Sequence, residues 1–413
     1  MKQYLDVLKD ILETGDVKTD RTGTGTTSKF GGMMKFSLRH GIWPIPTTRE
    51  VAYKKIAEEL EWMLKGIISV DWLQDRDNKI WNSWMGPESG TIGPMYGEQW
   101  RNWTTGLDEG DVNAIFDKIA NDYGTLDLNL PEIREYFLKE TAKKMTPFES
   151  GGRGGVDQLM NIVNELKNNP DSRRLVVNVW HAGLLPDTKM TPAQNADAGR
   201  MALAPCHSMW QVNTAPMSAF EVLRYSMDQE DFAVAIFKEV FEGMRGLNHE
   251  AQEQYYKTRI NSELVNRGLL VGKSMQYNLG NDGELELTEA GQLEVDKILD
   301  GGFTARKLSL ACFARSQDVP LGTVFNVGMY SLLAHLLAEV TGFVPWEYTH
   351  FMGDYHIYHD QHEGVNKQLE RTPMAPARII VDPTLEDVTK FDSTRLTVYY
   401  KSHPPIRFKP AAV

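Results

Sequence analysis

The chain has 413 residues, a formal net charge of −12 and only two cysteines. This length allows two or three average domains, or one large elaborated domain. The negative charge provides no general attraction for nucleic acid or an anionic membrane, so an anionic ligand would need a local arginine cluster. Two cysteines without a spacing motif fit a reducing cytosol. No signal peptide or apolar run of about 20 residues is visible, so a cytoplasmic protein without a membrane span is expected.

The first elements expected along the chain are a helix, a glycine-rich turn and a strand. Apolar residues recur at helical spacing over 4–14, and Gly15 is a natural stop. The segment 20–26 alternates glycine and threonine after Arg21 and could surround an oxyanion with backbone N–H groups. An ordinary turn is the simpler interpretation. A strand is predicted over 28–38.

A helix predicted over 51–66 leads into a segment rich in aromatic residues. Tryptophans, glycines and a tyrosine follow one another between residues 80 and 103 without regular spacing. This pattern favours a surface on which a flat ligand stacks, with a structural aromatic cluster as the alternative. Residues 104–155 are polar and acidic and end in a glycine-rich hinge.

Two adjacent arginines precede the next predicted strand. A helix is expected over 156–168, and Arg173 and Arg174 then lead into a strand over 175–180. Because strand side chains alternate, the two arginines cannot both point into the core. They form a plausible anion clamp, and a solvated pair is the alternative. Residues 184–200 are expected to form a loop.

Cys206 lies between Pro205, which restricts the backbone, and an apolar stretch suited to a strand. A thiol at the start of a strand, beside His207, is a candidate nucleophile. A buried core cysteine is the alternative. Residues 214–304 are expected to be mostly helical, with helices over 219–244, 250–268 and 288–299.

The core pattern resumes in a strand over 308–313 and a helix over 325–340. This helix is apolar on nearly every face, so it should be buried. Asn326 near its start would be a buried amide, which the amide edge of a ligand could satisfy. The histidines at 356, 359 and 362 suggest a metal site, but their spacing brings two at most onto one helix face. No metal is therefore expected.

Together these motifs closely resemble the thymidylate synthase family. The matching segments follow the family's order and are 20–26, 59–62, 80–103, 171–174, 201–211, 315–322, 325–326 and 353–358. The resemblance implies an α/β (α+β) fold that contains a large mixed sheet and a buried central helix. It also implies a single catalytic domain over 1–413. The segments near 104–155, 184–200 and 214–304 are expected to be insertions, largely helical, in loops of that domain.

The family's reaction is the transfer of a one-carbon unit from 5,10-methylenetetrahydrofolate to C5 of dUMP, a step of dTMP biosynthesis. C5 is a poor nucleophile, and a thiolate that adds at C6 turns the ring into an enolate that attacks the folate iminium. By resemblance, Cys206 is that nucleophile, and nearby arginines would favour its thiolate. Glu59 would be the general acid and base that relays protons to O4 through water. The implied catalytic residues are Cys206, Glu59, Tyr96, His207, Asn326 and Asp318.

The resemblance also implies the residues that hold the two ligands, in a homodimer whose partner subunit contributes Arg173 and Arg174 to the phosphate site. The amide of Asn326 would read the uracil edge, which points to dUMP over dCMP. The implied dUMP residues are Arg21, Arg173, Arg174, Gln211, Arg315, Ser316, Asn326, His356 and Tyr358. The implied folate residues are Arg49, Ile80, Trp81, Trp84, Leu203, Asp318, Leu321, Gly322, Phe325 and Val413. Arg49 would meet the glutamate tail, and Val413 would belong to a closing tail that excludes water.

Several positions depart from the family pattern. Glu61 stands where leucine is usual, and its Glu-Leu-Glu-Trp context resembles phage deoxynucleotide hydroxymethylases. Those relatives add water instead of hydride to the same exocyclic methylene intermediate. A second carboxylate near Glu59 could order that water. Ala314, Gln317 and His181 are also atypical.

Other positions match the methyl-transferring members of the family. Trp81, Leu203 and the Val413 tail would shield the intermediate from water. The resemblance therefore favours dTMP and dihydrofolate as products. The alternative is 5-hydroxymethyl-dUMP and tetrahydrofolate, as in a phage protein acting in host cytoplasm. A non-catalytic structural protein that binds nucleotide or folate is a third interpretation.

Overall fold

The computed structural model describes residues 1–19, 23–103, 109–127, 129–137, 155–229, 249–272 and 285–408. Its centre is a six-stranded mixed sheet with the strand order β1-β2-β9-β8-β5-β4. The strands are β1 (Asp16–Lys18), β2 (Thr26–Ser37), β4 (Val176–Asn178), β5 (His207–Pro216), β8 (Arg306–Asp318) and β9 (Val344–Tyr358). Only the β8–β9 pair is parallel within this sheet. The predicted α/β class with a large mixed sheet is confirmed.

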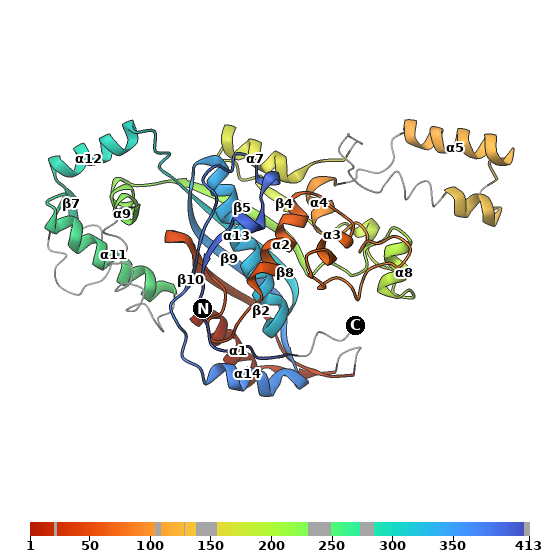
Figure 1. Cartoon of the computed structure of the whole chain (residues 1–413), viewed down its shortest axis with the longest axis horizontal. Helices are drawn as coiled ribbons and strands as arrows, with labels where there is room; N and C mark the ends of the chain where they lie inside the picture. Colours follow the sequence, from red (N-terminus) through yellow and green to blue (C-terminus); the bar gives the residue numbers. More distant parts are fainter. Residues whose placement is uncertain are drawn as a thin grey trace.

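The helix α13 (Val324–Thr341) connects the two parallel strands and lies across the centre of the sheet (Figure 1). Most of its residues are buried, as its uniform apolar composition predicted. By length and composition the stretch Val319–Thr341 could cross a membrane, which differs from the expectation that no segment would. However, 78% of its most apolar window is buried inside the protein, so it is the core helix of this fold.

Other helices complete the main core. The helix α2 (Tyr53–Leu64) packs on α13, whereas α1 (Lys2–Thr14) packs on β2 and β9. The remaining helices around this core are α3 (Asp71–Gln74), α4 (Gly97–Arg101), α7 (Gln158–Asn168) and α14 (His362–Leu369). A small second sheet pairs β3 (Ile42–Trp43), β10 (Ala377–Ile380) and β11 (Thr397–Tyr399). The helices expected over 4–14, 51–66, 156–168 and 325–340 are all present, with ends shifted by one or two residues.

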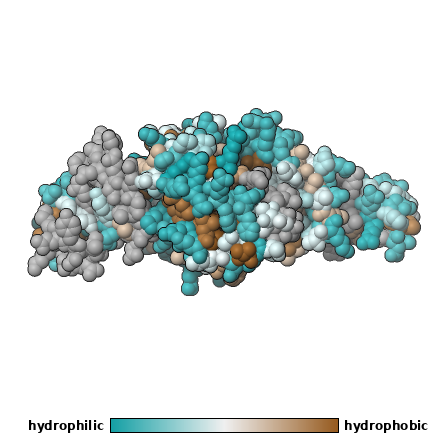
Figure 2. Space-filling view, turned by 90° about the horizontal axis from the view of Figure 1, so that it is seen from below, coloured by the Kyte–Doolittle hydropathy of each residue, from teal (hydrophilic) through white to brown (hydrophobic). Residues whose placement is uncertain are grey.

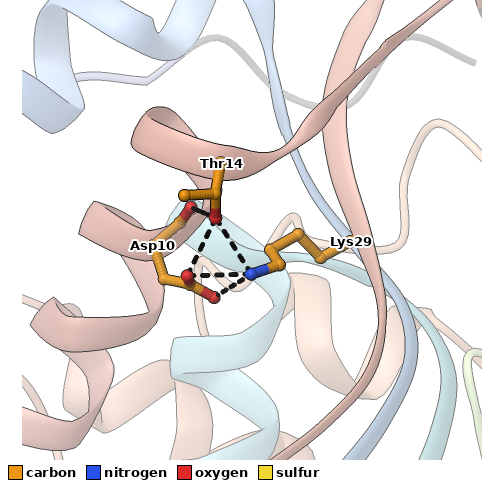
Figure 3. A network of polar contacts seen from close by, with 3 residues as sticks. All are labelled: Asp10, Thr14 and Lys29. Carbon is orange, nitrogen blue, oxygen red and sulfur yellow. Dashed lines mark hydrogen bonds and ion pairs between the residues drawn. The ribbon is translucent and has the colours of Figure 1, made fainter.

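A polar network joins α1 to β2 (Figure 3). The Nζ of Lys29 lies 2.7 Å from Asp10 Oδ2 and 3.0 Å from the hydroxyl of Thr14. The two charged side chains are 30% and 45% exposed, so solvent screens the ion pair and its contribution to stability is small.

The three expected insertions differ in structure. In the first, α5 (Glu109–Tyr123) forms a small core with residues near Ile133, while 104–108 and 138–154 lie outside the described residues. The second is not simply a loop, because Thr191 forms a capping box that starts the short helix α8 (Pro192–Asp197).

The third insertion has its own hydrophobic core at one end of the sheet, where Val344 and Trp346 contact it. Its elements are α9 (Ala219–Gln229), α11 (His249–Asn266), β6 (Leu270–Gly272), β7 (Leu285–Leu287) and α12 (Glu289–Asp300). The helix expected over 219–244 is observed to residue 229, and its remainder lies outside the described residues. Figure 1 shows this group and α5 at opposite ends of the molecule.

Candidate active site

Cys206 lies immediately before β5, in a backbone segment fixed from two sides. Its carbonyl accepts a hydrogen bond from Arg315 N of β8 at 2.8 Å, and its N–H donates to the hydroxyl of Tyr96 at 3.3 Å. The side chain of Cys206 is half-buried, whereas the other cysteine, Cys312, is fully buried. The structure therefore assigns the core interpretation to Cys312 and leaves Cys206 as the cysteine that a ligand can reach.

The guanidinium of Arg315 wraps the turn that carries Cys206. It donates to the carbonyls of Pro205 at 2.9 Å and Ala204 at 2.7 Å. Gly353 of β9 permits this arrangement, because a Cβ there would lie 2.6 Å from the Arg315 carbonyl oxygen. Burial raises the pKa of the Cys206 thiol, and the nearby Arg315 charge opposes that shift. Cys206 is therefore a thiol at neutral pH until a ligand changes its surroundings.

An aromatic group covers the same site. The rings of Tyr96 and His207 stack with centroids 4.0 Å apart, and Trp81 lies 5.7 Å from Tyr96 and 5.6 Å from Trp84. The contacts within 80–103 are those of a structural aromatic cluster, and the stacking of a flat ligand on it stays a prediction. Trp100 is fully buried and packs on Trp210, so it belongs to the core.

Glu59 of α2 enters this aromatic group from the core side. It accepts a hydrogen bond from Trp81 Nε1 at 2.9 Å and is 7% exposed. Burial raises the pKa of Glu59 to about 7, and the Trp81 N–H partly opposes the shift. A carboxyl group with a pKa near neutrality can both donate and accept protons at physiological pH.

His207 is held on its other side by Tyr330 of α13. The hydroxyl of Tyr330 lies 2.6 Å from His207 Nδ1. Burial lowers the pKa of His207 to about 3, so the ring is neutral. The strand β5 thus places His207 beside Cys206 while the central helix fixes one nitrogen of its ring.

The ends of β8 and β9 bring further predicted residues to the site. Asp318 closes β8, accepts hydrogen bonds from Leu321 N and Gln361 Nε2, and has its pKa raised by burial. His356 Nδ1 lies 2.8 Å from Asp354 Oδ1, and its ring is 5.1 Å from that of Tyr358. These side chains lie next to one another because the parallel strands end at the same edge of the sheet.

Asn326 differs from the expectation of a buried amide. It is half-buried in the first turn of α13, and its amide makes no hydrogen bond to another described residue. The amide is therefore available to a ligand. Six of the implied folate residues are half-buried in the same way, and they are Ile80, Trp84, Leu203, Leu321, Gly322 and Phe325.

One expectation about the carboxylates of α2 is wrong in geometry. Glu61 does not lie beside Glu59: it forms an ion pair with Lys65 and accepts from Ser393 N at 2.9 Å. Residues two apart on a helix are separated by about 200° around its axis, so the two carboxylates face opposite sides. Arg49 is 5% exposed and donates to the Pro320 carbonyl, and its contact with the glutamate tail stays a prediction.

Some predicted residues lie away from this cluster or outside the described residues. Arg173 and Arg174 are exposed just before β4, and Gln211 contacts the Arg173 carbonyl at 3.5 Å. Ser316 follows Arg315 on β8 and is half-buried. Arg21 and Val413 are outside the described residues, so their roles stay predictions. Among the described residues no group of three or more histidine, cysteine or acidic side chains could hold a metal ion.

Sequence reasoning missed the inner neighbours of His207, which are Tyr330, Cys312, Tyr348 and His350. The one available signal was the pair Tyr348 and His350 at alternate positions of β9, which is unusual for a strand covered by an apolar helix.

A mixed sheet that packs against a buried helix, with a cysteine at the start of an inner strand, defines an α/β protein with a thiol-centred site. A family model described as Thymidylate synthase matches residues 2–236 and 291–412. The chain therefore belongs to the thymidylate synthase family. The unmatched residues 237–290 fall within the third expected insertion.

Proposed function

We propose that this chain transfers a one-carbon unit from 5,10-methylenetetrahydrofolate to C5 of dUMP and forms dTMP and dihydrofolate. The observation that carries the proposal is the arrangement around Cys206. A reachable thiol, a guanidinium, a stacked aromatic surface and a carboxyl with a pKa near 7 meet at one end of the sheet. Family membership supplies the substrate class.

In the proposed first step the Cys206 thiol loses its proton to water, and Sγ adds to C6 of the uracil ring. The ring electrons move to O4. The bond between the folate methylene carbon and N10 opens, and the enolate attacks that carbon through C5. Arg315 and Ser316 bind the nucleotide phosphate, while Asn326 pairs with N3–H and O4 of the ring. Binding of the nucleotide beside Arg315 brings the thiol into contact with its target carbon, which compensates for the raised pKa of Cys206.

The next step removes the proton from C5 and releases tetrahydrofolate by elimination, leaving an exocyclic methylene group. Glu59, with its pKa near 7, exchanges protons with O4 through water. Hydride transfer from tetrahydrofolate to the methylene then gives the methyl group of dTMP. Finally the Cys206–C6 bond breaks and regenerates the thiol.

The choice between hydride and water depends on how well water is excluded from the methylene group. Trp81 is 9% exposed, packs on Tyr96 and donates to Glu59, which supports a dry environment. Glu61 would have been the residue to order an added water, and its carboxylate is held by Lys65 and Ser393 instead. Both observations favour dTMP over 5-hydroxymethyl-dUMP.

The proposed enzyme is a homodimer that pairs the uncovered faces of two sheets. A row of apolar residues crosses four strands on the face away from α13. In the strand register, Met33 is opposite Phe351, Phe351 is opposite Phe313, and Phe313 is opposite Met209. Met33 is 57% exposed, and the other three are half-buried. Figure 2 shows apolar surface bordered by hydrophilic residues on one side of the molecule. In this dimer the exposed Arg173 and Arg174 reach the phosphate of the partner's site.

Product analysis tests the proposal directly. The full chain is incubated with dUMP and 5,10-methylenetetrahydrofolate, and the nucleotide is identified by mass while the folate is followed by absorbance. We expect dTMP and dihydrofolate in equal amounts. A nucleotide one oxygen heavier, formed together with tetrahydrofolate, would replace the proposal with the hydroxymethylase. No turnover would support the binding-protein interpretation.

A further inference from the structure

The reaction proposed above does not use the second expected insertion, residues 184–200. Its short helix α8 ends at Asp197, whose side chain makes contacts outside the insertion. One carboxylate oxygen, Asp197 Oδ1, accepts hydrogen bonds from the backbone N–H groups of Ser89 at 2.8 Å and Glu88 at 3.2 Å. The insertion is therefore bonded to a loop of the aromatic segment, residues 86–93.

Glycines at both ends of this loop permit the close approach of the insertion. A Cβ at Gly86 would lie 2.1 Å from Asp197 Oδ1, and a Cβ at Gly93 would lie 1.9 Å from the carbonyl oxygen of Arg200. Glycine is the residue that allows another part of the chain to come this near to the backbone. The loop and the insertion therefore pack against each other at two points.

Hydrogen bonds within the insertion fix the position of α8. The side chain of Asn195 is 1% exposed, accepts from Asp187 N at 2.7 Å and donates to the Asp187 carbonyl at 3.0 Å. The carbonyl of Asn195 accepts from Arg200 N at 2.8 Å. Together with the capping box at Thr191, these bonds hold Asp197 in place for the loop.

The two halves of the loop are held differently. The second half, residues 90–93, is bonded to the rest of the core, since the Gly90 carbonyl accepts from Val70 N at 2.9 Å and Ile92 is buried. The first half, residues 86–89, is exposed at its last three positions, and Asp197 holds the backbone there. Loss of the Asp197 carboxylate should therefore release the first half alone.

The first half of the loop follows the aromatic residues that are implied in folate binding. Trp84 packs edge-on against Trp81 with ring centroids 5.6 Å apart, and one residue separates Trp84 from Gly86. The implied dUMP residues Arg315 and Asn326 lie on β8 and α13 instead. A change in the first half should therefore affect the folate and not the nucleotide.

We infer that Asp197 is a positioning residue that holds the first half of the loop, and with it Trp84, in the conformation that binds the folate. Because the loop is ordered before the ligand arrives, folate binding does not have to order it. An insertion that supplies no reacting group thus sets the affinity for one substrate. The effect on folate rests on the proposed function, whereas the fixing of the loop does not.

Hydrogen exchange of the unliganded full chain, followed by mass spectrometry of its peptides, tests the fixing of the loop. Asp197→Ala removes the acceptor, so the peptide that contains residues 86–89 should exchange faster than in wild type. Asp197→Asn keeps an oxygen that can accept both N–H groups, so slow exchange should be retained. Asp187→Ala is the matched control, because the Asp187 carboxylate accepts from Lys189 N within the insertion. Unchanged exchange in Asp197→Ala would overturn the inference.

Steady-state kinetics then tests the effect on the folate. With saturating dUMP, the KM for 5,10-methylenetetrahydrofolate should rise about tenfold in Asp197→Ala, as expected for the loss of hydrogen bonds to a charged group. The kcat and the KM for dUMP should not change, since the second half of the loop, which leads into Tyr96, stays bonded to the core. Asp197→Asn and Asp187→Ala should retain the wild-type KM for the folate.

The outcomes separate the two proposals. Faster exchange with an unchanged KM for the folate would overturn the role of Asp197 in folate binding, and so would equal rises of both KM values. A wild-type chain without turnover would reject the proposed function. The dissociation constants of tetrahydrofolate for wild type and Asp197→Ala would then decide the inference. Weaker binding by Asp197→Ala would support it, and equal binding or no binding by either protein would overturn it.

Discussion

Burial sets the protonation of the residues around Cys206. Glu59 has its pKa raised to about 7 and His207 has its pKa lowered to about 3, and desolvation is the largest cause in each case. The same effect therefore makes the carboxyl a proton exchanger and keeps the imidazole a neutral hydrogen-bond partner. Neither state follows from the residue type alone, because both depend on the packing of α2, α13 and the aromatic segment.

The raised pKa of Glu59 predicts a stability that depends on pH. The folded protein keeps this proton while the unfolded chain releases it between pH 4.5 and about 7, so the contribution of Glu59 to stability falls as pH rises through that window. At about 1.4 kcal/mol per pKa unit, Glu59→Gln should recover about 3 kcal/mol at pH 8 and little at pH 4. Chemical unfolding across this pH range measures the difference.

Glu98 provides the matched control. It is 3% exposed, burial raises its pKa to about 8, and it lies outside the proposed chemistry. Glu98→Gln should therefore stabilise the protein at alkaline pH, as Glu59→Gln does. Glu98→Gln should retain turnover, whereas Glu59→Gln should lose it. If Glu59→Gln gave the same stability difference at pH 4 and pH 8, the assigned pKa would be wrong.

At the scale of elements, close packing of α2 and α4 brings Glu59 and Tyr96 to the same site. Gly97 at the start of α4 makes this possible, because a Cβ there would lie 2.6 Å from Met63 Cα. Tyr96 itself has a φ of 42°, a conformation that few residues other than glycine adopt. The backbone around 96–97 is thus shaped to bring the aromatic ring over Cys206.

Gly97→Ala should separate the two helices and destabilise the protein by about 1–3 kcal/mol, the usual effect of overpacking. It should also lower turnover, because Tyr96 moves away from His207. Thermal unfolding and kcat measure the two effects. Gly183→Ala is the control, since its nearest contact would be 3.4 Å. Equal stability of both variants would show that the α2–α4 contact does not fix the site.

Sequence patterns predicted those elements whose side chains repeat regularly. The apolar stripes of α1, α2 and α7 were sufficient to predict these helices. The uniform apolar character of α13 was sufficient to predict a buried helix. No strand was predicted over β9, because Tyr348, His350 and Gly353 interrupt the alternation that identifies a strand. Its position depends on parallel pairing with β8, a contact between distant segments that local patterns do not contain.

The candidate site was predicted mainly through the family motifs, and the geometry refined it. Cys206, Glu59, Tyr96, His207 and Arg315 come together as the resemblance implied. The suggestion that Glu61 lies beside Glu59 and orders a water molecule failed. The two residues are close in sequence, but their side chains point to different sides of the helix. The partners of His207 in the core could not be predicted, since they meet only when the central strands and α13 have formed.

At the scale of the whole molecule, the proposed dimer makes each site depend on two chains. The cysteine and the arginines 173 and 174 of one site then come from different subunits. This division predicts complementation between two inactive variants, Cys206→Ser and the double variant Arg173→Ala with Arg174→Ala.

Mixing equal amounts of the two variants under conditions that exchange subunits should restore activity to about one quarter of wild type. Half of the dimers would be mixed, and each would contain one site with an intact cysteine and intact partner arginines. Activity of the mixture and of each variant alone is measured with dUMP and folate. If the arginines acted within their own chain, mixing would restore nothing.

The central claim is that Cys206 forms a covalent bond to the pyrimidine during one-carbon transfer, and an analogue with fluorine at C5 tests it most directly. Fluorine cannot leave as a proton does, so the reaction should stop after the folate has joined the ring. Mass spectrometry of the digested protein should then find one peptide that contains Cys206, the nucleotide and the folate together. An adduct on Cys312, or no adduct under conditions in which the protein is folded, would contradict the account.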